Sequence, residues 1–193
     1  MAAKYMIADP IIGVPVPVSQ TYTFNPLTSA GAIVGPPFPF GLVANAVDNQ
    51  SGSTNLGAGQ FIFAAGYSTA SAVSSAGQWV QIRGNTAWLL LHAQSASKFP
   101  IGVAAGPLSN TNVCGWVQIQ GMADYVRGNA VDGVAGNPLY ILAATAGILQ
   151  TAVSAGAMVL GAVFPVVNTA PSSNGSWTAQ LNYPQMVGLT ASV

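Results

Sequence analysis

Side chains capable of acid–base or nucleophilic chemistry are very few in this chain of 193 residues. It contains one histidine (His92), one cysteine (Cys114), four aspartates and no glutamate. A hydrolytic triad needs a serine, a histidine and an acid that converge, but no G-x-S-x-G motif occurs and no aspartate flanks His92. The sequence therefore predicts a protein that is not an enzyme, with no catalytic residues, and places His92 in the core or in an interface.

Metal and cofactor sites are equally hard to assemble from these residues. A zinc site built on His92 and Cys114 would lack two of its usual ligands, and the segment around Arg127 is too poor in oxygen ligands for calcium. Asp124 and Asp132 flank Arg127, and the simplest interpretation is a surface ion pair. We expect no metal and no cofactor, and we expect Cys114 to be a small buried apolar residue, because no basic neighbour would activate its thiol.

The charge content limits the possible partners. Charged residues make up 4% of the chain and the formal net charge is zero, whereas an ordinary soluble domain has about 25% charged residues. A protein that binds nucleic acid needs clustered lysine and arginine, so nucleic acid is not an expected partner. A neutral polar surface can pack against other subunits without the cost of desolvating charges, which favours an oligomeric structural protein.

A membrane-spanning helix is the other possibility raised by the apolar composition. The uncharged stretch 139–167 is long enough to cross a bilayer. However, Gly147, Gly156, Gly161 and Pro165 interrupt it at strand-like intervals, and no lysine or arginine follows it. We expect several short strands joined by glycine turns here, and no membrane partner.

Residues 1–60 are predicted to form an extended, proline-rich N-terminal arm, ending in a surface loop over 46–60. The runs 11–19 and 35–41 are too rich in proline for a helix and too apolar for a solvated linker. An apolar arm of this kind must lie either on its own body or on a neighbouring subunit. The candidate assembly contacts are Val14, Val16, Phe38 and Phe40.

Residues 61–167 are predicted to form a β-rich body that contains an internal repeat. The motif WVQI-x-G occurs at 79–84 and again at 116–121, and a segment ending in Ala-Ala-Gly precedes each copy, at 61–66 and 101–106. Within WVQI the residue types alternate, which places Trp and Gln on one face of a strand and Val and Ile on the other.

The rest of the body, and a loop with a C-terminal strand over 168–193, complete an all-β fold. We expect a sandwich or barrel of short antiparallel strands, with one short helix at 68–77. The strand 176–184 should place Trp177, Ala179, Leu181 and Tyr183 on one face. The other expected strands are 86–94, 123–128, 138–142, 147–151 and 157–167, the last with a bulge at its central glycine.

The stretch 99–167 resembles the capsid decoration (cement) proteins of tailed bacteriophages. The shared elements are Gly-Val-Ala at 102–104, Gly-Trp-Val-Gln at 115–118, Gly-Asn-Pro-Leu-Tyr at 136–140 and a later Gly-x-x-x-Gly-x-Ala. Asn137 stands where the family more often has aspartate, and both residues suit a turn. The resemblance implies a β-rich structural protein on the outer capsid surface of the virion. It also implies the major capsid protein and further copies of this chain, as a homotrimer, as partners.

A carbohydrate-binding β-module or adhesin tip, on a virion or a cell surface, is the alternative. Aromatic side chains could form a platform for a sugar, although a tryptophan in a β-domain more often belongs to the core or to an interface. The tryptophans concerned are Trp79, Trp88, Trp116 and Trp177.

Overall fold

Every element in the described part of the computed structural model is a β-strand, which confirms the all-β fold class. The structure describes residues 5–7, 16–24, 35–48, 56–67, 72–84, 86–89, 100–128, 135–141, 147–150, 158–165 and 176–187. The strands are β1 (Tyr5–Ile7), β2 (Val16–Pro17), β3 (Tyr22–Thr23), β4 (Val43–Asp48), β5 (Ala58–Gly66), β6 (Trp79–Arg83), β7 (Thr86–Leu89), β8 (Ile101–Ala104), β9 (Val113–Arg127), β10 (Pro138–Ile141), β11 (Leu149–Gln150), β12 (Met158–Val163) and β13 (Ser176–Val187).

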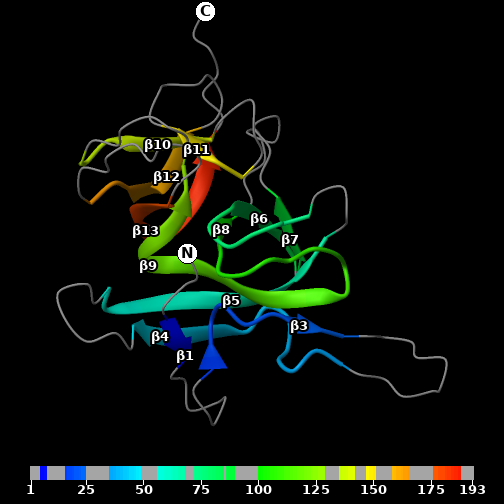
Figure 1. The fold of residues 1–193 in the computed structure, drawn as a ribbon. Coiled ribbons are helices and arrows are strands. Elements are labelled where there is room, and N and C mark those ends of the chain that lie inside the picture. The colour runs from blue at the N-terminus through cyan, green and yellow to red at the C-terminus, as the bar shows by residue number, and fades with distance from the viewer. Residues whose placement is uncertain are drawn as a thin grey trace, which may run out of the picture.

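Five of these strands close into a small barrel. Neighbouring strands pair in the order β9, β8, β6, β7, β5, and β5 pairs in turn with β9, which completes the ring (Figure 1). The expectation of short antiparallel strands needs two corrections. The strand β9 has 15 residues, and β7 lies parallel to β5.

The side chains on the two sides of the barrel wall form two separate apolar cores. Alternate residues of a strand belong to different cores, as the sequence pattern predicts. The inner core draws on all five barrel strands and therefore fills the barrel. It consists of Ala64, Val73, Val80, Ile82, Ala87, Ala104, Leu108, Val117 and Ile119. The outer core contains Trp79 and Trp116 together with Phe61 and Phe63. The prediction that Trp and Val/Ile of WVQI face opposite ways is confirmed in both copies.

In the folded sheet, the Ala-Ala-Gly strand of each repeat pairs with the WVQI segment of the other repeat. The Ala-Ala-Gly strand of the first copy (β5) pairs with the WVQI segment of the second (in β9), so that Phe63 lies opposite Trp116. The Ala-Ala-Gly strand of the second copy (β8) pairs with the WVQI segment of the first (β6), so that Val103 lies opposite Trp79. Phe63 and Val103 are the third residues of their segments, so the register is the same in both pairs. The two WVQI strands are therefore structurally equivalent in this pairing.

The strand β9 is long enough to continue the same sheet beyond the barrel, and we call this outer part the second sheet. Beyond the barrel it pairs with β13, followed by β12, β10 and β11, while β4 and β1 continue from β5 (Figure 1). The stretch 139–167 thus contributes strands, as expected, and no described helix is long and apolar enough to cross a bilayer. The predicted bulge is confirmed, because the β12–β13 register shifts around Gly161, where φ is 74°.

Three local expectations were wrong. Residues 72–77 form a bridge and a turn instead of a helix, and 68–71 lie outside the described residues. The loop predicted over 46–60 is shorter, because β4 runs to Asp48 and β5 begins at Ala58. Tyr183 does not share the buried face of Trp177, Ala179 and Leu181: its φ of 47° breaks the strand alternation and turns the side chain outward, where it is 51% exposed.

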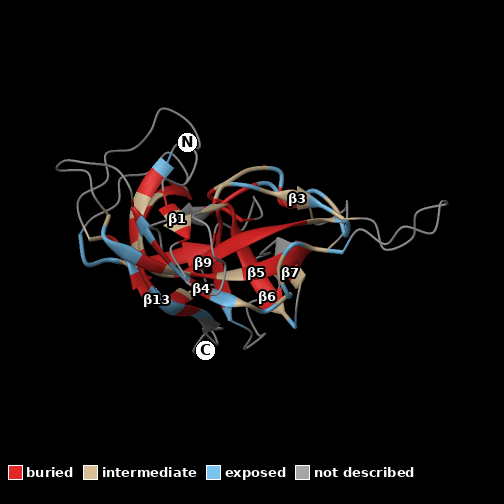
Figure 2. Ribbon diagram, turned by 90° about the horizontal axis from the view of Figure 1, so that it is seen from below, coloured by how far each residue is buried: buried red, intermediate tan, exposed pale blue. Residues whose placement is uncertain are grey.

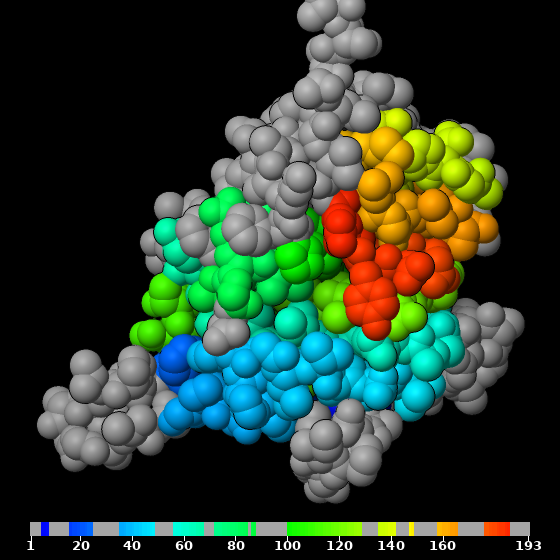
Figure 3. Space-filling view, turned by 180° about the vertical axis from the view of Figure 1, so that it is seen from behind, coloured from blue at the N-terminus to red at the C-terminus, as the bar shows by residue number. Residues whose placement is uncertain are grey.

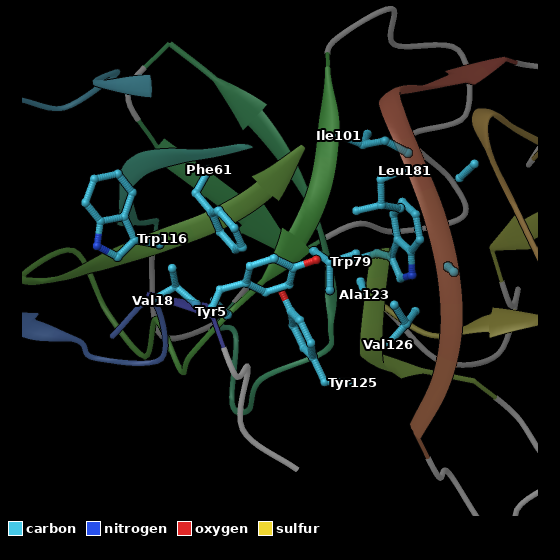
Figure 4. Close-up of a cluster of buried hydrophobic side chains, with 14 of the residues drawn as sticks. Tyr5, Val18, Phe61, Trp79, Ile101, Trp116, Ala123, Tyr125, Val126 and Leu181 are labelled. Atoms are coloured by element: carbon cyan, nitrogen blue, oxygen red, sulfur yellow. The ribbon is translucent and has the colours of Figure 1, made fainter. Parts of the chain in front are cut away.

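The described parts of the N-terminal arm lie on the body of the same chain. Tyr5, Ile7 and Val18 are buried in the outer core, and Figure 4 shows Tyr5 and Val18 among residues from the central strands. Figure 2 shows the buried central strands beneath half-buried arm segments. Of the two alternatives for the arm, the described residues therefore favour its own body.

Candidate functional site

A partly exposed aromatic ridge lies where the arm covers the outer core. We use this name for Tyr22, Phe24, Phe38 and Phe40, all of which are half-buried. The Phe38 ring centroid lies 5.4 Å from that of the buried Trp116, and Phe40 stacks on the buried Phe63 at 5.9 Å. The ridge is therefore anchored on the core by one side of its rings and reaches solvent with the other.

The ridge brings together two of the four predicted assembly contacts. Residues 35–43 alternate strictly between exposed and half-buried positions, which puts Phe38 and Phe40 on one side, as their spacing predicts. Val16 is half-buried and packs against the outer core from β2. Val14 lies outside the described residues. The prolines at the alternate positions, Pro37 and Pro39, are exposed.

A groove lined by neutral amides lies on the other side of β4 and β5. Residues Ala44 and Ala46 of β4 face the outer core, so Asn45 between them faces away from it. The groove has a volume of about 300 Å³ and contains no charged residue. Its lining residues, which we call the amide groove, are Asn45, Ala58, Gly59, Gln60, Gln120, Gly121 and Gln180.

Tyr183 orders one wall of the amide groove. Its hydroxyl donates a hydrogen bond to Oε1 of Gln60. The Nε2 of Gln60 then donates to Oδ1 of Asn45 at 3.1 Å. Tyr183 is the only described residue other than glycine with a positive φ. Such a conformation is unfavourable for an aromatic residue and occurs where the surrounding structure enforces it.

An apolar pocket of about 270 Å³ opens at the end of the barrel beside the same tyrosine. It is lined by four isoleucines from four barrel strands, together with Tyr183 and Pro184 of β13. The isoleucines are Ile62, Ile82, Ile101 and Ile119. The exposed side of Tyr183 thus separates a polar hollow from an apolar one.

The most exposed large apolar side chains of the described residues share one face. The valines and the leucine lie on the side of their strands that points away from the outer core, because their buried neighbours belong to that core. The left-handed φ of Tyr183 turns its side chain outward as well. Figure 3 shows this face, with β4 in light blue below β13 in red and β12 in orange. The side chains are Val43, Val47, Leu160, Val163 and Tyr183.

The titratable groups of the described residues do not converge on a reactive site. No group of three or more His, Cys, Asp or Glu side chains that could hold a metal occurs among them. Cys114 is a free, fully buried thiol, as expected, and burial raises its pKa to about 11. Burial also raises the pKa values of Tyr5 and Tyr125. His92 and Asp132 lie outside the described residues.

The three tryptophans whose side chains the structure describes do not form an exposed platform. Trp79, Trp116 and Trp177 are all 1% exposed or less, and nothing is described of the Trp88 side chain. The sequence suggested tryptophans as sugar contacts and did not predict the amide groove. Its signal was weak: single Asn and Gln residues at outward positions of strands far apart in the chain.

Comparisons with known proteins find no match among protein-family models, curated proteins or solved structures.

Proposed function

We propose that this protein is a structural component of a bacteriophage virion, which binds the outer surface of the icosahedral capsid and stabilises it by bridging neighbouring capsid subunits. Its partners are the major capsid protein and other copies of itself, in a homotrimer. The function is mechanical, because each bound copy adds buried area between capsid subunits and many copies act together.

The aromatic ridge is the observation that supports this proposal most directly. A partly exposed row of aromatic residues beside exposed prolines is costly to leave in water, and aromatic residues are enriched in protein interfaces. In a chain with only 4% charged residues, such a ridge can be covered by a partner without burying unpaired charges. The resemblance of 99–167 to decoration proteins adds the identity of that partner.

The test measures co-sedimentation of the purified protein with phage heads that lack it. The variant Pro37→Asp places a charge at an exposed position next to Phe38 of the ridge, where it leaves the core untouched. We expect saturable binding of the unaltered protein and loss of binding by Pro37→Asp. Val47→Ser, at an exposed position on the opposite side of the sheet, is the matched control and should bind normally.

Light scattering tests the trimer separately, in the absence of heads. The expected mass is three times the 19.5 kDa of one chain. If light scattering gives the mass of a monomer at all concentrations, the proposed trimer is wrong. If the unaltered protein does not bind to heads, the capsid function is wrong. If Pro37→Asp binds as well as the unaltered protein, the ridge is not the binding surface.

A further inference from the structure

The amide groove has the chemistry of a site for an uncharged, hydroxyl-rich ligand. Each side-chain amide of Asn45, Gln60, Gln120 and Gln180 carries both a hydrogen-bond donor and an acceptor. A sugar hydroxyl is likewise a donor and an acceptor. No lining residue is charged, so an anionic or cationic ligand would find no countercharge in the groove.

The internal hydrogen bonds of the groove determine which amide atoms remain for a ligand. Because Gln60 accepts from Tyr183 and donates to Oδ1 of Asn45, the Nδ2 group of Asn45 is left to donate. The side-chain amide of Gln120 has no hydrogen-bond partner among the described residues and lines the same hollow. The amide of Asn45 is therefore oriented before a ligand arrives, and the amide of Gln120 can turn to offer either its donor or its acceptor.

Tyr183 supplies an apolar surface beside these polar groups. The residue is 51% exposed, and its hydroxyl donates a hydrogen bond to Gln60. An exposed tyrosine provides a rigid ring with one apolar face and one polar end. The C–H face of a sugar ring can pack on the apolar face of the tyrosine, while the sugar hydroxyls form hydrogen bonds with the amides. The left-handed backbone of Tyr183 is thus retained at a place where it presents the ring next to the groove.

We propose that the amide groove binds one ring of a neutral saccharide, with Asn45 and Gln120 contacting hydroxyls and Tyr183 contacting the C–H face. The volume of about 300 Å³ lies at the lower end of small-ligand sites, which suits a single sugar ring of a longer glycan. This inference goes beyond the proposed capsid function and does not depend on it, because the groove lies on the side of β4 and β5 opposite the aromatic ridge.

The test is saturation-transfer NMR with the full chain and single sugars as probes. Glucose, galactose, mannose and N-acetylglucosamine are the neutral probes, and N-acetylneuraminic acid is the anionic comparison. We expect transfer to at least one neutral sugar and none to the anionic one. Gln120→Met keeps the side-chain length and removes the amide, and it should weaken binding about tenfold, the effect of losing one hydrogen bond.

Two further variants separate binding from folding. Gln20→Met makes the same change at an exposed glutamine outside the groove, and binding should be unchanged. Tyr183→Gly removes the ring but suits the positive φ, so the thermal midpoint should not fall while binding is lost.

Three outcomes would overturn the proposal. The first is the absence of transfer to every neutral sugar at millimolar concentrations. The second is unchanged binding by both Gln120→Met and Tyr183→Gly. The third is a concentration-dependent dimer that Tyr183→Gly abolishes, because it would assign the groove to a second copy of the chain instead.

Discussion

The Tyr5 hydroxyl donates a hydrogen bond of 2.6 Å to the carbonyl oxygen of Met122, and so ties the start of the arm to the strand that joins the barrel to the second sheet. Gln118 donates to the same carbonyl at 2.9 Å and accepts from the Tyr125 hydroxyl at 2.8 Å. Figure 4 shows the hydroxyls of Tyr5 and Tyr125 directed towards each other. The buried polar groups of this region therefore form one connected network in an otherwise apolar core.

Tyr5→Phe should lower the free energy of unfolding by about 1 kcal/mol, the net contribution of one buried hydrogen bond. The cost stays modest because Gln118 still satisfies the Met122 carbonyl. Tyr5→Ala also empties a fully buried ring position and should cost about 3–5 kcal/mol. Urea titration of both variants measures the difference, and equal losses would show that the hydroxyl carries most of the effect.

Alkaline pH should destabilise the fold. Burial raises the pKa of Cys114 from 9.0 to about 11, and it also raises the pKa values of Tyr5, Tyr22 and Tyr125. The folded state therefore favours the protonated groups. This stabilisation is complete below the unfolded-state values and is lost as the pH rises through the folded-state values.

The measurement is the urea midpoint as a function of pH, which should be constant below about pH 9 and should fall above it. Cys114→Ala should reduce the fall, since it removes one of the contributing groups. Iodoacetamide should modify Cys114 slowly at pH 8 in the native protein and rapidly in urea. Rapid native labelling would contradict the buried, protonated thiol.

Gly102→Ala should destabilise the contact between β8 and β9. A Cβ at this position would lie 2.6 Å from the Gln118 carbonyl oxygen and 2.6 Å from a methyl group of Val117, so the strands would have to separate. We expect a loss of about 1–3 kcal/mol, typical of overpacking. Gly35→Ala is the control, because nothing lies within 4 Å of its Cβ position, and it should be neutral or slightly stabilising. Similar effects of both changes in thermal melts would argue against this packing.

Phe63→Ala and Phe40→Ala should show how much the core and the ridge each contribute to the free energy of unfolding. Phe63 is fully buried and contacts both Phe38 and Trp116, so its removal should cost about 3–5 kcal/mol. Phe40 is half-buried, and its removal should cost roughly 1–2 kcal/mol. Chemical denaturation gives both values. A larger loss for Phe40 would mean that the arm contributes more to the fold than its exposure indicates.

Sequence periodicity predicted much of the local structure, since a strand has a period of two whatever its neighbours are. The opposite faces of Trp79 and Val80 and the single side shared by Phe38 and Phe40 follow from this local geometry. The bulge at Gly161 was predicted from a glycine near the middle of a strand. Tyr183 was misplaced because alternation assumes an unbroken extended backbone, and one left-handed residue reverses the faces beyond it.

The amide groove could not have been predicted in the same way. Its amides come from β4, β5, β9 and β13, whose neighbour relations depend on the path of the whole sheet. The side of the strand on which each amide lies is a local property. That the four amide side chains line one groove depends on the fold of the whole chain.

The sequence by itself determined an all-β chain with few charges and alternating strand faces, because composition and a period of two act residue by residue. Only the tertiary structure decided which strands pair: that β5 lies against the second WVQI segment and β8 against the first, and that the barrel closes between β5 and β9. The physical reason is that strand pairing depends on how all the side chains together fill the two cores. Because the two WVQI segments are alike, either could pair with either Ala-Ala-Gly strand, and only the packing of the whole fold distinguishes the two arrangements.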